Sequence, residues 1–563
     1  MKKRILIVGG VAGGASAAAR ARRLDAEAEI IIFEKGPHVS FSNCALPYYL
    51  GGLVEDSDSL VLMDPKRFRT QYDIDVRIRH EVVAIDRKAK SVLVRDLDTG
   101  AETREPYSTL ILSPGANPIL PQSISGADLP HVFTVRNVVD IVKLQEYTAH
   151  VDTVAVVGGG FIGVEVAENL TRAGKHVVLA EAAEQIMAPF DYDMVQMLHK
   201  EMMDNGVELI LGDGVQEITK TQLRLASGRT VPAQAVVMAI GVTPETALAR
   251  SAGLKIGTTG GILVNHNYQT SDENIYAVGD AIEVYNRLTH RPTRLALAGP
   301  AQKQARAAAD HICGIPNRVT GVIGSSVVRI FGLNAASTGL NEKAARAAGI
   351  PYDFAYVIPA DKVGILPGSA PMHFKLIFEV PTGRILGAQA IGKGNVDKRI
   401  DVIAAILAMG GTLEDVKDLE LCYSPLFGTA KDVVNHAALV GLNVLNGVFR
   451  QVPVSRARSL VEQGACIVDV REKGEFAAGH LHGAVNIPLS ELRQRMDEIP
   501  RDVPVYLHCR SSQRSYNACM ALQNRGYDNV WNISGSFLGI CLYEYFNDVT
   551  WHRQPIVTAY NFR

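Results

Sequence analysis

Residues 5–14 read ILIVGGVAGG, a short apolar run that ends in a glycine-rich loop. The alanine-rich stretch after it predicts a helix to about residue 24, and EIIIFE at residues 29–34 predicts a second strand that ends at Glu34. This order is typical of a dinucleotide-binding βαβ unit, because glycines let backbone N–H groups approach a pyrophosphate and the final acid can bind ribose hydroxyls. Val11 stands where the GxGxxG pattern has its middle glycine. A tight turn that binds nothing is the alternative.

A second unit of the same kind begins at residue 154. Residues 154–163 read VAVVGGGFIG, which matches GxGxxG in full, and residues 176–181 form a strand that ends at Glu181. A carboxylate at this position accepts hydrogen bonds from ribose hydroxyls and repels a 2′-phosphate, so it favours NADH over NADPH. Two readings stay open here: Glu181 merely ends a strand, or a nearby Lys or Arg reverses the preference.

Two further stretches indicate how these units are combined. Residues 110–116, LILSPGA, predict a strand entering a Pro-Gly turn, and residues 274–280, NIYAVGD, predict a strand that ends in Gly-Asp. The layout resembles the flavin disulfide reductases, in which an FAD domain is interrupted by an NAD domain. The resemblance implies that Asp280 binds the ribityl chain of FAD, against the alternative of a plain strand-end turn. The residues expected to bind the two nucleotides are Gly9, Gly10, Ala12, Gly13, Gly14, Glu34, Lys35, Pro114, Gly115, Gly279, Asp280, Gly158, Gly160, Gly163, Glu181 and Gly241.

A lone cysteine follows the first unit. Residues 40–48 read SFSNCALPY, and Cys44 has no second cysteine nearby. The stretch resembles the SFxxCxxPY signature of the coenzyme A disulfide reductases, in which one cysteine reacts and coenzyme A supplies the other sulfur. The resemblance implies that Cys44 is the nucleophile. Because the thiolate does the chemistry, its pKa is expected to be lowered by local donors and the flavin site. An inert buried thiol is the alternative.

Coenzyme A carries a 3′-phosphate and a pyrophosphate, so cations are expected beside it. Arg20 and Arg23 stand late in the first helix. By resemblance they face coenzyme A, while Ser40 and Asn43 hold its thiol end. The alternative is a solvated helix face that neighbouring acids neutralise.

Residues from about 322 to 440 resemble the dimerisation domain of the same reductases, where tyrosines of the partner subunit reach the cysteine. The stretch LCYSP at residues 421–425 matches the one that carries such a tyrosine, so Tyr423 is a candidate proton donor, or else an ordinary packed tyrosine. The segment that carries the second tyrosine reads GILPG here, at residues 364–368. This apolar replacement favours a leaving sulfur smaller than a coenzyme A thiol.

The last part of the chain reads as a separate α/β domain. DVRE at residues 469–472, GHLHGAVNIP at 479–488 and CRSSQRS at 509–515 occur in the order found in rhodanese domains, which they resemble. A cysteine at a strand end, before a helix, faces backbone N–H groups that stabilise an anionic persulfide. A phosphate-binding loop and a degenerate module are the alternatives. The expected catalytic cysteine is Cys509, and the expected persulfide loop is Arg510, Ser511, Ser512, Gln513, Arg514 and Ser515.

Composition excludes several functions. The 563 residues carry a formal net charge of −2, which argues against broad attraction to nucleic acid. An apolar run long enough for a membrane span is missing from the sequence. The seven cysteines lack CxxC or zinc-ligand spacing, so no metal site is expected, and they suit a reducing cytoplasm.

These patterns predict an α/β chain of four domains. The expected boundaries are an FAD domain at 1–118 and 246–321, an inserted NAD domain at 119–245, a dimerisation domain at 322–440, a linker at 441–452 and a rhodanese domain at 453–563. The resemblance implies a homodimeric, NADH-dependent flavoprotein that reduces persulfides or polysulfides, coenzyme A persulfide first among them. Two alternatives stay open: a coenzyme A disulfide reductase or NADH oxidase with an accessory rhodanese domain, and a module that delivers sulfur to a protein partner.

Overall fold

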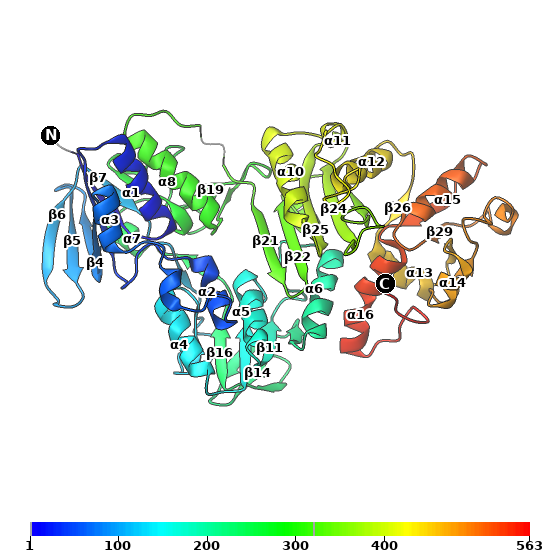
Figure 1. The fold of residues 1–563 in the computed structure, drawn as a ribbon, viewed down its shortest axis with the longest axis horizontal. Coiled ribbons are helices and arrows are strands. Elements are labelled where there is room, and N and C mark those ends of the chain that lie inside the picture. Colours follow the sequence, from blue (N-terminus) through cyan, green and yellow to red (C-terminus); the bar gives the residue numbers. More distant parts are fainter. Residues whose placement is uncertain (1–2, 319–320, 563) are drawn as a thin grey trace. The chain divides into compact units, whose positions relative to one another are not determined.

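The computed structural model describes residues 3–318 and 321–562, and these residues form two compact units (Figure 1). The first unit comprises the described residues up to Glu184 together with Ile210–Val322. The second comprises Gln185–Leu209 and the described residues from Ile323 onward. Within the described residues, no helix is both long and apolar enough to cross a membrane.

The first unit is built on a parallel sheet of five strands in the order β18-β7-β1-β2-β3. Strands β1, β2 and β7 are apolar and buried at their centres, as expected for a sheet covered on both faces, whereas the edge strand β3 is only partly buried. Helices α1 and α8 pack against each other through their alanines, which allow close approach. The bounds are β1 Arg4–Val8, β2 Glu29–Glu34, β3 Asp75–Ile78, β7 Thr109–Leu112, β18 Ile275–Ala277, α1 Ala12–Leu24 and α8 Ala298–Ile312.

A second sheet of five strands has the order β12-β11-β10-β16-β9. Strands β10, β11 and β16 are parallel, and helix α5 follows β10 as the glycine motif predicts. The bounds are β9 Val132–Phe133, β10 Thr153–Val157, β11 His176–Glu181, β12 Glu208–Leu211, β16 Ala235–Met238, α4 Val138–Thr148 and α5 Phe161–Arg172.

The two glycine motifs fold alike. A Cβ atom at Gly14 would collide with the carbonyl oxygen of Gly9, and one at Gly163 would collide with that of Gly158. The final glycine of each motif is therefore required for the helix to pack on the strand. The middle position differs, because Val11 is accommodated before α1 and a Cβ at Gly160 would meet open space.

Smaller elements complete the first unit. They are the antiparallel sheets β4-β5-β6 (His80–Asp86, Ser91–Asp96, Glu102–Pro106) and β13-β14-β15 (Val215–Ile218, Gln222–Leu225, Thr230–Pro232), the pairs β8 (Ala116–Pro118) with β17 (Val242–Pro244) and β19 (Val284–Tyr285) with β20 (Pro292–Thr293), and the helices α2 Leu46–Leu50, α3 Pro65–Tyr72 and α7 Ala247–Ser251.

The second unit contains an antiparallel sheet of order β21-β22-β25-β24-β23 with helices α9 to α12. The central strands β24 and β25 are buried along almost their whole length. The bounds are β21 Ser325–Ile330, β22 Leu333–Gly339, β23 Tyr352–Val357, β24 Met372–Glu379, β25 Ile385–Gly392, α9 Glu342–Ala348, α10 Val396–Met409, α11 Leu413–Lys417 and α12 Val433–Leu445.

The chain ends in a parallel sheet of order β26-β30-β29-β27-β28, also within the second unit. The bounds are β26 Gln451–Val452, β27 Cys466–Asp469, β28 Val485–Asn486, β29 Val505–His508, β30 Val530–Ile533, α13 Ala457–Glu462, α14 Lys473–Ala477, α15 Gln513–Gln523 and α16 Ser536–Trp551. Together with the two nucleotide-type sheets, it confirms the predicted α/β class, and the antiparallel sheet with its helices forms an α+β domain between them in the sequence.

Helix α6, Tyr192–Asp204, packs with the second unit although the predicted NAD domain spans residues 119–245. It lies against α16 through Tyr192 and Tyr543, whose rings meet edge-on at 5.7 Å, and through His199 and Phe546 at 4.8 Å. Helix α6 therefore belongs to the second unit, whereas the residues before Gln185 and after Leu209 belong to the first unit.

Candidate active site

A cavity of about 590 Å³ opens at the carboxyl ends of the first parallel sheet. It has the size of a cofactor site. Residues from the sequence-predicted nucleotide set line it: Gly9, Ala12, Gly13, Glu34, Lys35, Pro114, Gly115, Gly279 and Asp280. The predicted Gly10, before α1, and Gly14, in the first turn of α1, are not among the lining residues, and a Cβ at Gly10 would collide with Val39.

The residues of this cavity fit a dinucleotide. Gly9, with φ of +90°, leaves no room for a Cβ beside the Ser113 carbonyl, and Gly115, with φ of +75°, faces open space. These two glycines form a bare backbone cradle at the N-terminus of α1, where N–H groups favour an anion. Burial raises the pKa of Asp280, which also lines this cavity.

The two strand-end acids occupy equivalent positions. The carboxylate of Glu34 accepts hydrogen bonds from the N–H groups of Gly10 and Gly36 at 2.9 and 2.8 Å. The carboxylate of Glu181 accepts from those of Gly159 and Ala183 at 2.6 and 2.8 Å. Each carboxylate oxygen keeps a second lone pair for a ribose hydroxyl. Gly241, with φ of +120°, follows β16 in the same sheet as Glu181.

Cys44 lies in a short 3₁₀ turn, Asn43–Ala45, and its side chain is exposed. One helical turn later, the Tyr48 hydroxyl donates a hydrogen bond of 3.0 Å to Glu165 Oε1 on α5. Desolvation by the surrounding protein, followed by the negative charges of Glu165 and Asp280, raises the pKa of the Cys44 thiol. The protein's own groups therefore raise this pKa, against the lowering expected from local donors, because desolvation acts first and two carboxylates add to it. The expected effect of the flavin site stays a prediction.

We expect Glu165→Gln to lower the pKa of Cys44, because the substitution removes the carboxylate whose charge raises this pKa more than that of Asp280 does. The check is the pH dependence of iodoacetamide alkylation of the Cys44 peptide, followed by mass spectrometry. The titration should move to lower pH. Glu168→Gln on the same helix is the control, since Glu168 instead pairs with Arg172. If the alkylation of Cys44 has the same pH dependence in Glu165→Gln as in wild type, the charge of Glu165 does not act on the Cys44 thiol.

A separate cavity of about 340 Å³ lies beside α1. Arg20, Arg23 and Ser40, three of the residues predicted to bind coenzyme A, line it, whereas Asn43 lines the larger cavity. Ser40 and Asn43, which were predicted to hold the thiol end of coenzyme A, therefore line different cavities. The other lining residues are Ala15, Ser16, Ala19, Met63, Phe68, Tyr72, Gln302 and Arg306.

The arginines of this cavity differ in their contacts. Arg20 Nε lies 2.5 Å from Asp310 Oδ1, so a carboxylate on α8 already neutralises part of its charge. The Arg23 guanidinium lies over the Tyr72 ring at 5.5 Å. Sequence reasoning missed Arg306, because α8 follows α1 by nearly three hundred residues and only the packing of these helices brings Arg306 here.

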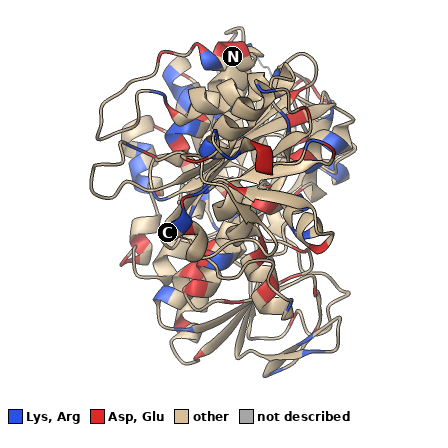
Figure 2. Cartoon of the chain, turned by 90° about the vertical axis from the view of Figure 1, so that its right-hand side faces the viewer, with Lys and Arg blue, Asp and Glu red and all other residues tan. Residues whose placement is uncertain are grey.

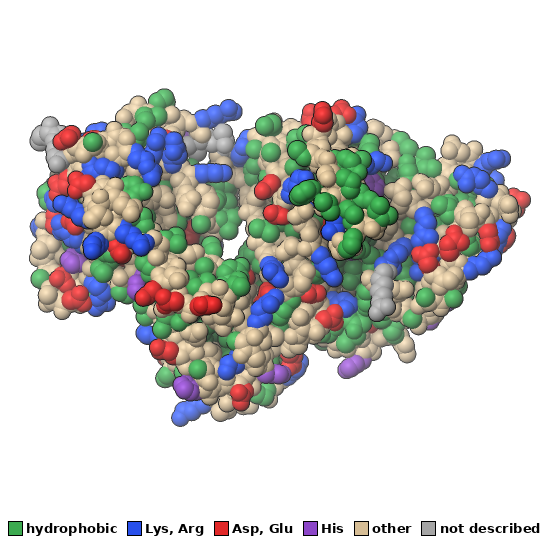
Figure 3. Space-filling view, in the orientation of Figure 1, with side chains coloured by type: hydrophobic (Ala, Val, Ile, Leu, Met, Phe, Trp, Pro, Cys, Tyr) green, Lys and Arg blue, Asp and Glu red, His purple; other side chains and the backbone are tan. Residues whose placement is uncertain are grey.

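Tyr423 is half exposed in the loop before α12. Leu426 and Phe427 in the same loop are 65% and 62% exposed, and Ile365 is 88% exposed. Figure 3 shows hydrophobic side chains gathered over the part of the second unit that carries α10 to α12. Figure 2 shows acidic and basic residues interspersed along the ribbon. The exposed apolar loops are typical of a surface that another protein surface covers.

Cys509 follows β29 and is buried. Its Sγ accepts a hydrogen bond from Ser515 Oγ at 3.5 Å and lies 3.9 Å from Ser536 Oγ. Ser512 takes a left-handed conformation, φ +76°, where the loop enters α15. Arg514 binds Glu475 through both carboxylate oxygens, at 2.6 and 2.7 Å. The predicted order of cysteine, tight loop and helix is present. Arg514 is held by Glu475, which was not among the residues predicted from the sequence.

Two residues of the rhodanese-type motifs make structural contacts. Asp469 is fully buried and binds Arg471 at 2.6 Å. His480 stacks on Phe476 at 3.8 Å and bonds to its carbonyl oxygen.

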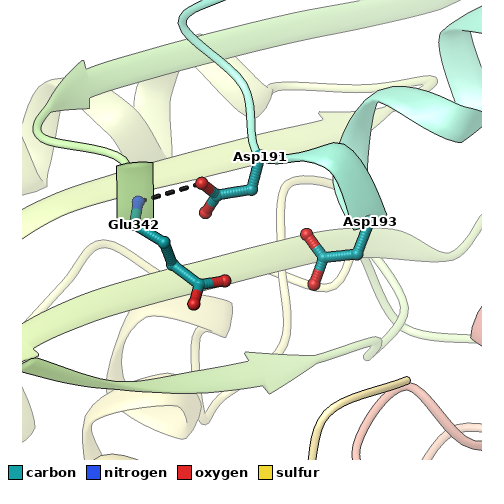
Figure 4. A group of neighbouring side chains, drawn as sticks. All are labelled: Asp191, Asp193 and Glu342. Atoms are coloured by element: carbon teal, nitrogen blue, oxygen red, sulfur yellow. Dashed lines mark hydrogen bonds between the residues drawn. The ribbon is translucent and has the colours of Figure 1, made fainter. Parts of the chain in front are cut away.

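Asp191, Asp193 and Glu342 bring three carboxylates together in the second unit (Figure 4). The Glu342 N–H donates to Asp191 at 2.9 Å. The fully buried ammonium of Lys375 lies among them, 2.8 Å from Asp193 and 3.2 Å from Asp191, and also contacts Glu342. Burial alone would lower the pKa of Lys375, but the three carboxylates raise it. The lysine takes the place that a metal ion would need, so this cluster is an ionic core.

Comparison with known proteins assigns the chain to a family. Residues 3–305, more than half of the chain, match the family model described as pyridine nucleotide-disulphide oxidoreductase. A coenzyme A disulfide reductase of Staphylococcus epidermidis is 33% identical over 435 residues, which are 77% of this chain and 98% of that protein. This chain belongs to the pyridine nucleotide-disulphide oxidoreductase family. Such an oxidoreductase uses FAD and NAD(H), which agrees with the two glycine motifs.

Further matches extend over the rest of this oxidoreductase. Residues 325–433 match the dimerisation domain of the family, and residues 454–542 match the rhodanese-like domain. The crystal structure of reduced CoADR-RHD from Bacillus anthracis has a TM-score of 0.94 and 41% identity, covering 97% of this chain and 98% of that one. A NAD-dependent persulfide reductase from A. fulgidus has a TM-score of 0.90 and 33% identity, covering 95% and 99%.

Proposed function

We propose that this chain is an NADH-dependent flavoprotein that reduces persulfides, with coenzyme A persulfide as the substrate class, and releases sulfide. The observation that carries the proposal is the presence of two separate thiol sites in one chain, the exposed Cys44 beside the nucleotide cavity and the buried Cys509 in its loop. A sulfur-carrying cysteine has no role in the reduction of a simple disulfide. Similarity to the persulfide reductase over 95% of the chain supports it.

The residues have distinct proposed roles. The glycines, strand-end acids and Asp280 named in the sequence bind the two nucleotides. Arg20, Arg23 and Ser40 bind coenzyme A in the smaller cavity, and we add Arg306 to them. Asn43 faces the nucleotide cavity. Tyr423 is a proton donor supplied across a homodimer, which the dimerisation domain and its exposed apolar loops support.

The chemistry balances with one NADH and one proton per persulfide. The Cys44 thiolate attacks the carbon-bound sulfur of the persulfide, which forms a Cys44–coenzyme A disulfide and breaks the sulfur–sulfur bond, so that sulfide leaves and takes up a proton. Bound FAD, with NADH as the electron source, would supply the two electrons that restore both thiols. Attack on the terminal sulfur would instead give a Cys44 persulfide and release coenzyme A first. The loop of Cys509 carries the sulfane sulfur that feeds either route.

The competing function is that of a coenzyme A disulfide reductase with an accessory rhodanese domain. The similarity to the S. epidermidis coenzyme A disulfide reductase favours it, since that protein covers 77% of this chain and is itself spanned almost completely. The apolar Ile365 and Leu366, in place of a tyrosine, favour the persulfide.

The test compares coenzyme A persulfide with coenzyme A disulfide as parallel substrates and measures NADH consumption and sulfide release. We expect a kcat/KM at least about tenfold higher for the persulfide, a difference of roughly 1.4 kcal/mol in transition-state binding. Cys509→Ser should retain reduction of free coenzyme A persulfide and lose sulfide release from thiosulfate as donor. Equal or better turnover of the disulfide would make the chain a coenzyme A disulfide reductase.

A further inference from the structure

The persulfide loop, residues 509–515, is held from outside by helix α16. The N–H of Phe537 donates to the carbonyl of Cys509 at 2.9 Å, and that of Leu538 donates to the carbonyl of Arg510 at 3.0 Å. Ser536, the first residue of α16, accepts from the N–H of Cys509 at 3.2 Å. The start of α16 therefore sets where the backbone on either side of the Cys509 sulfur lies.

The start of α16 is itself unusual in conformation. Gly535 has φ of +76°, and the fully buried Ser536 has φ of +49°, which is costly for a residue with a side chain. Ser536 Oγ lies 3.1 Å from Ser512 Oγ and 3.4 Å from Ser515 Oγ, so a single hydroxyl contacts three residues of the persulfide loop. A strained residue of this kind persists only when its surroundings hold it in place.

Those surroundings come from the antiparallel sheet of the preceding domain. The ring of Tyr356, on β23, packs against Gly535 so closely that a Cβ there would lie 2.7 Å from Tyr356 Cε1. Tyr356 is 3% exposed, and its hydroxyl and His373 Nδ1, on β24, are 2.6 Å apart. The hydrogen bond fixes the ring on the sheet, so the ring cannot give way to a shift of Gly535.

A second contact reaches the loop from helix α12. His436 on α12 shares a side-chain hydrogen bond with Gln513. Asn443, two turns later, donates to the Tyr516 hydroxyl at 3.1 Å. The persulfide loop is thus fastened at its Cys509 end through Gly535 and Ser536 and at its helix end through α12. All of these residues belong to the second unit.

We propose that the dimerisation-type sheet positions the persulfide loop, with Tyr356 and His373 acting on Cys509 through Gly535 and Ser536. The rhodanese-like domain is then not an independent module, because its sulfur-carrying thiol is held in place by the domain before it. This inference rests on the proposed function for its biological role, but the placement of Cys509 is tested separately. Tyr356 and His373 are positioning residues, since neither touches the sulfur.

The test uses the full chain with thiosulfate as sulfur donor and cyanide as acceptor, so that NADH and Cys44 take no part. Cys509 displaces sulfite from thiosulfate and keeps its outer sulfur as a persulfide; cyanide then takes that sulfur as thiocyanate and restores the thiolate. We compare wild type with Tyr356→Phe and Tyr356→Leu. The matched control is Tyr352→Phe on the same strand, whose hydroxyl bonds to Glu342 and Arg346 instead.

We expect Tyr356→Leu to lower kcat for sulfur transfer by roughly 10- to 100-fold with a much smaller change in KM, because a displaced reacting group costs rate more than binding. Tyr356→Phe keeps the ring but loses its hydrogen bond to His373, so we expect it, like His373→Gln, to lower kcat by a smaller factor, roughly three- to fivefold. Tyr352→Phe should match wild type. Alkylation rates of the Cys509 and Cys44 peptides, measured in one sample, should change for Cys509 alone.

A Tyr356→Leu protein that is folded and transfers sulfur at the wild-type rate would overturn the inference. If that variant does not fold, Tyr356→Phe and His373→Gln decide: wild-type kcat and Cys509 alkylation in both would overturn it. Failure of the proposed function is a different result, namely no preference for coenzyme A persulfide in wild type, and it leaves these thiosulfate measurements unaffected.

Discussion

Cys44→Ser is expected to lower NADH-dependent sulfide release from coenzyme A persulfide by at least about a thousandfold. Serine keeps the size of the side chain but is not ionised near neutral pH, so it cannot attack the persulfide sulfur. Cys44 is the cysteine of the 40–48 stretch, and the turn in which it lies leaves the thiol exposed. One helical turn later, the Tyr48 hydroxyl is hydrogen-bonded to Glu165. The other cysteines of the described residues lie outside residues 40–48, so we expect none of them to act as the nucleophile in place of Cys44.

The measurement is sulfide release at saturating NADH, together with NADH-dependent reduction of an artificial dye. Dye reduction should persist in Cys44→Ser, because it needs the nucleotide sites and not the thiol. Cys422→Ser, which removes another exposed cysteine, is the control and should match wild type. Sulfide release by Cys44→Ser within tenfold of wild type would show that another thiol reacts.

Lys375→Met is expected to destabilise the second unit by about 3–5 kcal/mol, because it leaves three carboxylates without their counter-charge. Lys375 is fully buried and contacts Asp191, Asp193 and Glu342. These carboxylates come from α6 with its preceding turn and from α9, so the lysine on β24 ties a distant segment to the sheet. The measurement is the unfolding free energy from urea titration.

The pH dependence of this variant has a definite sign. In the native chain, burial already raises the pKa of Asp191, against the opposing charge of Lys375. Without the lysine, the neighbouring carboxylates still repel the charge of Asp191 and nothing opposes them, so the folded pKa of Asp191 rises further. The folded state then holds more protons than the unfolded state, so the stability of Lys375→Met should fall as the pH rises above the unfolded carboxylate range near 4.

Lys343→Met on α9 is the matched control, since it removes an exposed lysine beside Glu342 and should change stability by less than about 0.5 kcal/mol. A Lys375→Met protein as stable as wild type at neutral pH would mean that the three acids are not an ionic core. Asp191→Asn is expected to restore part of the stability of Lys375→Met, because it removes one of the unpaired charges.

Most residues of the candidate site could be predicted because they stand in short, contiguous sequence motifs. The strand, glycine loop, helix and acid of residues 5–34 and 154–181 are contiguous, so their chemistry was readable in sequence and the structure folds them alike. The sequence also identified Cys44 and Cys509, because each stands in a short motif of fixed spacing. The direction of the Cys44 pKa was not readable, since Glu165 and Asp280 are more than a hundred residues away.

By itself, then, the sequence determined the two dinucleotide units, the single-cysteine stretch and the rhodanese-like order of the C-terminal part, because each depends on backbone geometry within a few residues. Only the tertiary structure decided which distant side chains meet. It placed Arg306 beside Arg20, Asn43 in the larger cavity, α6 on the second unit and Tyr356 against Gly535. Such contacts follow from how buried faces of separate elements pack together, and no local pattern records that packing.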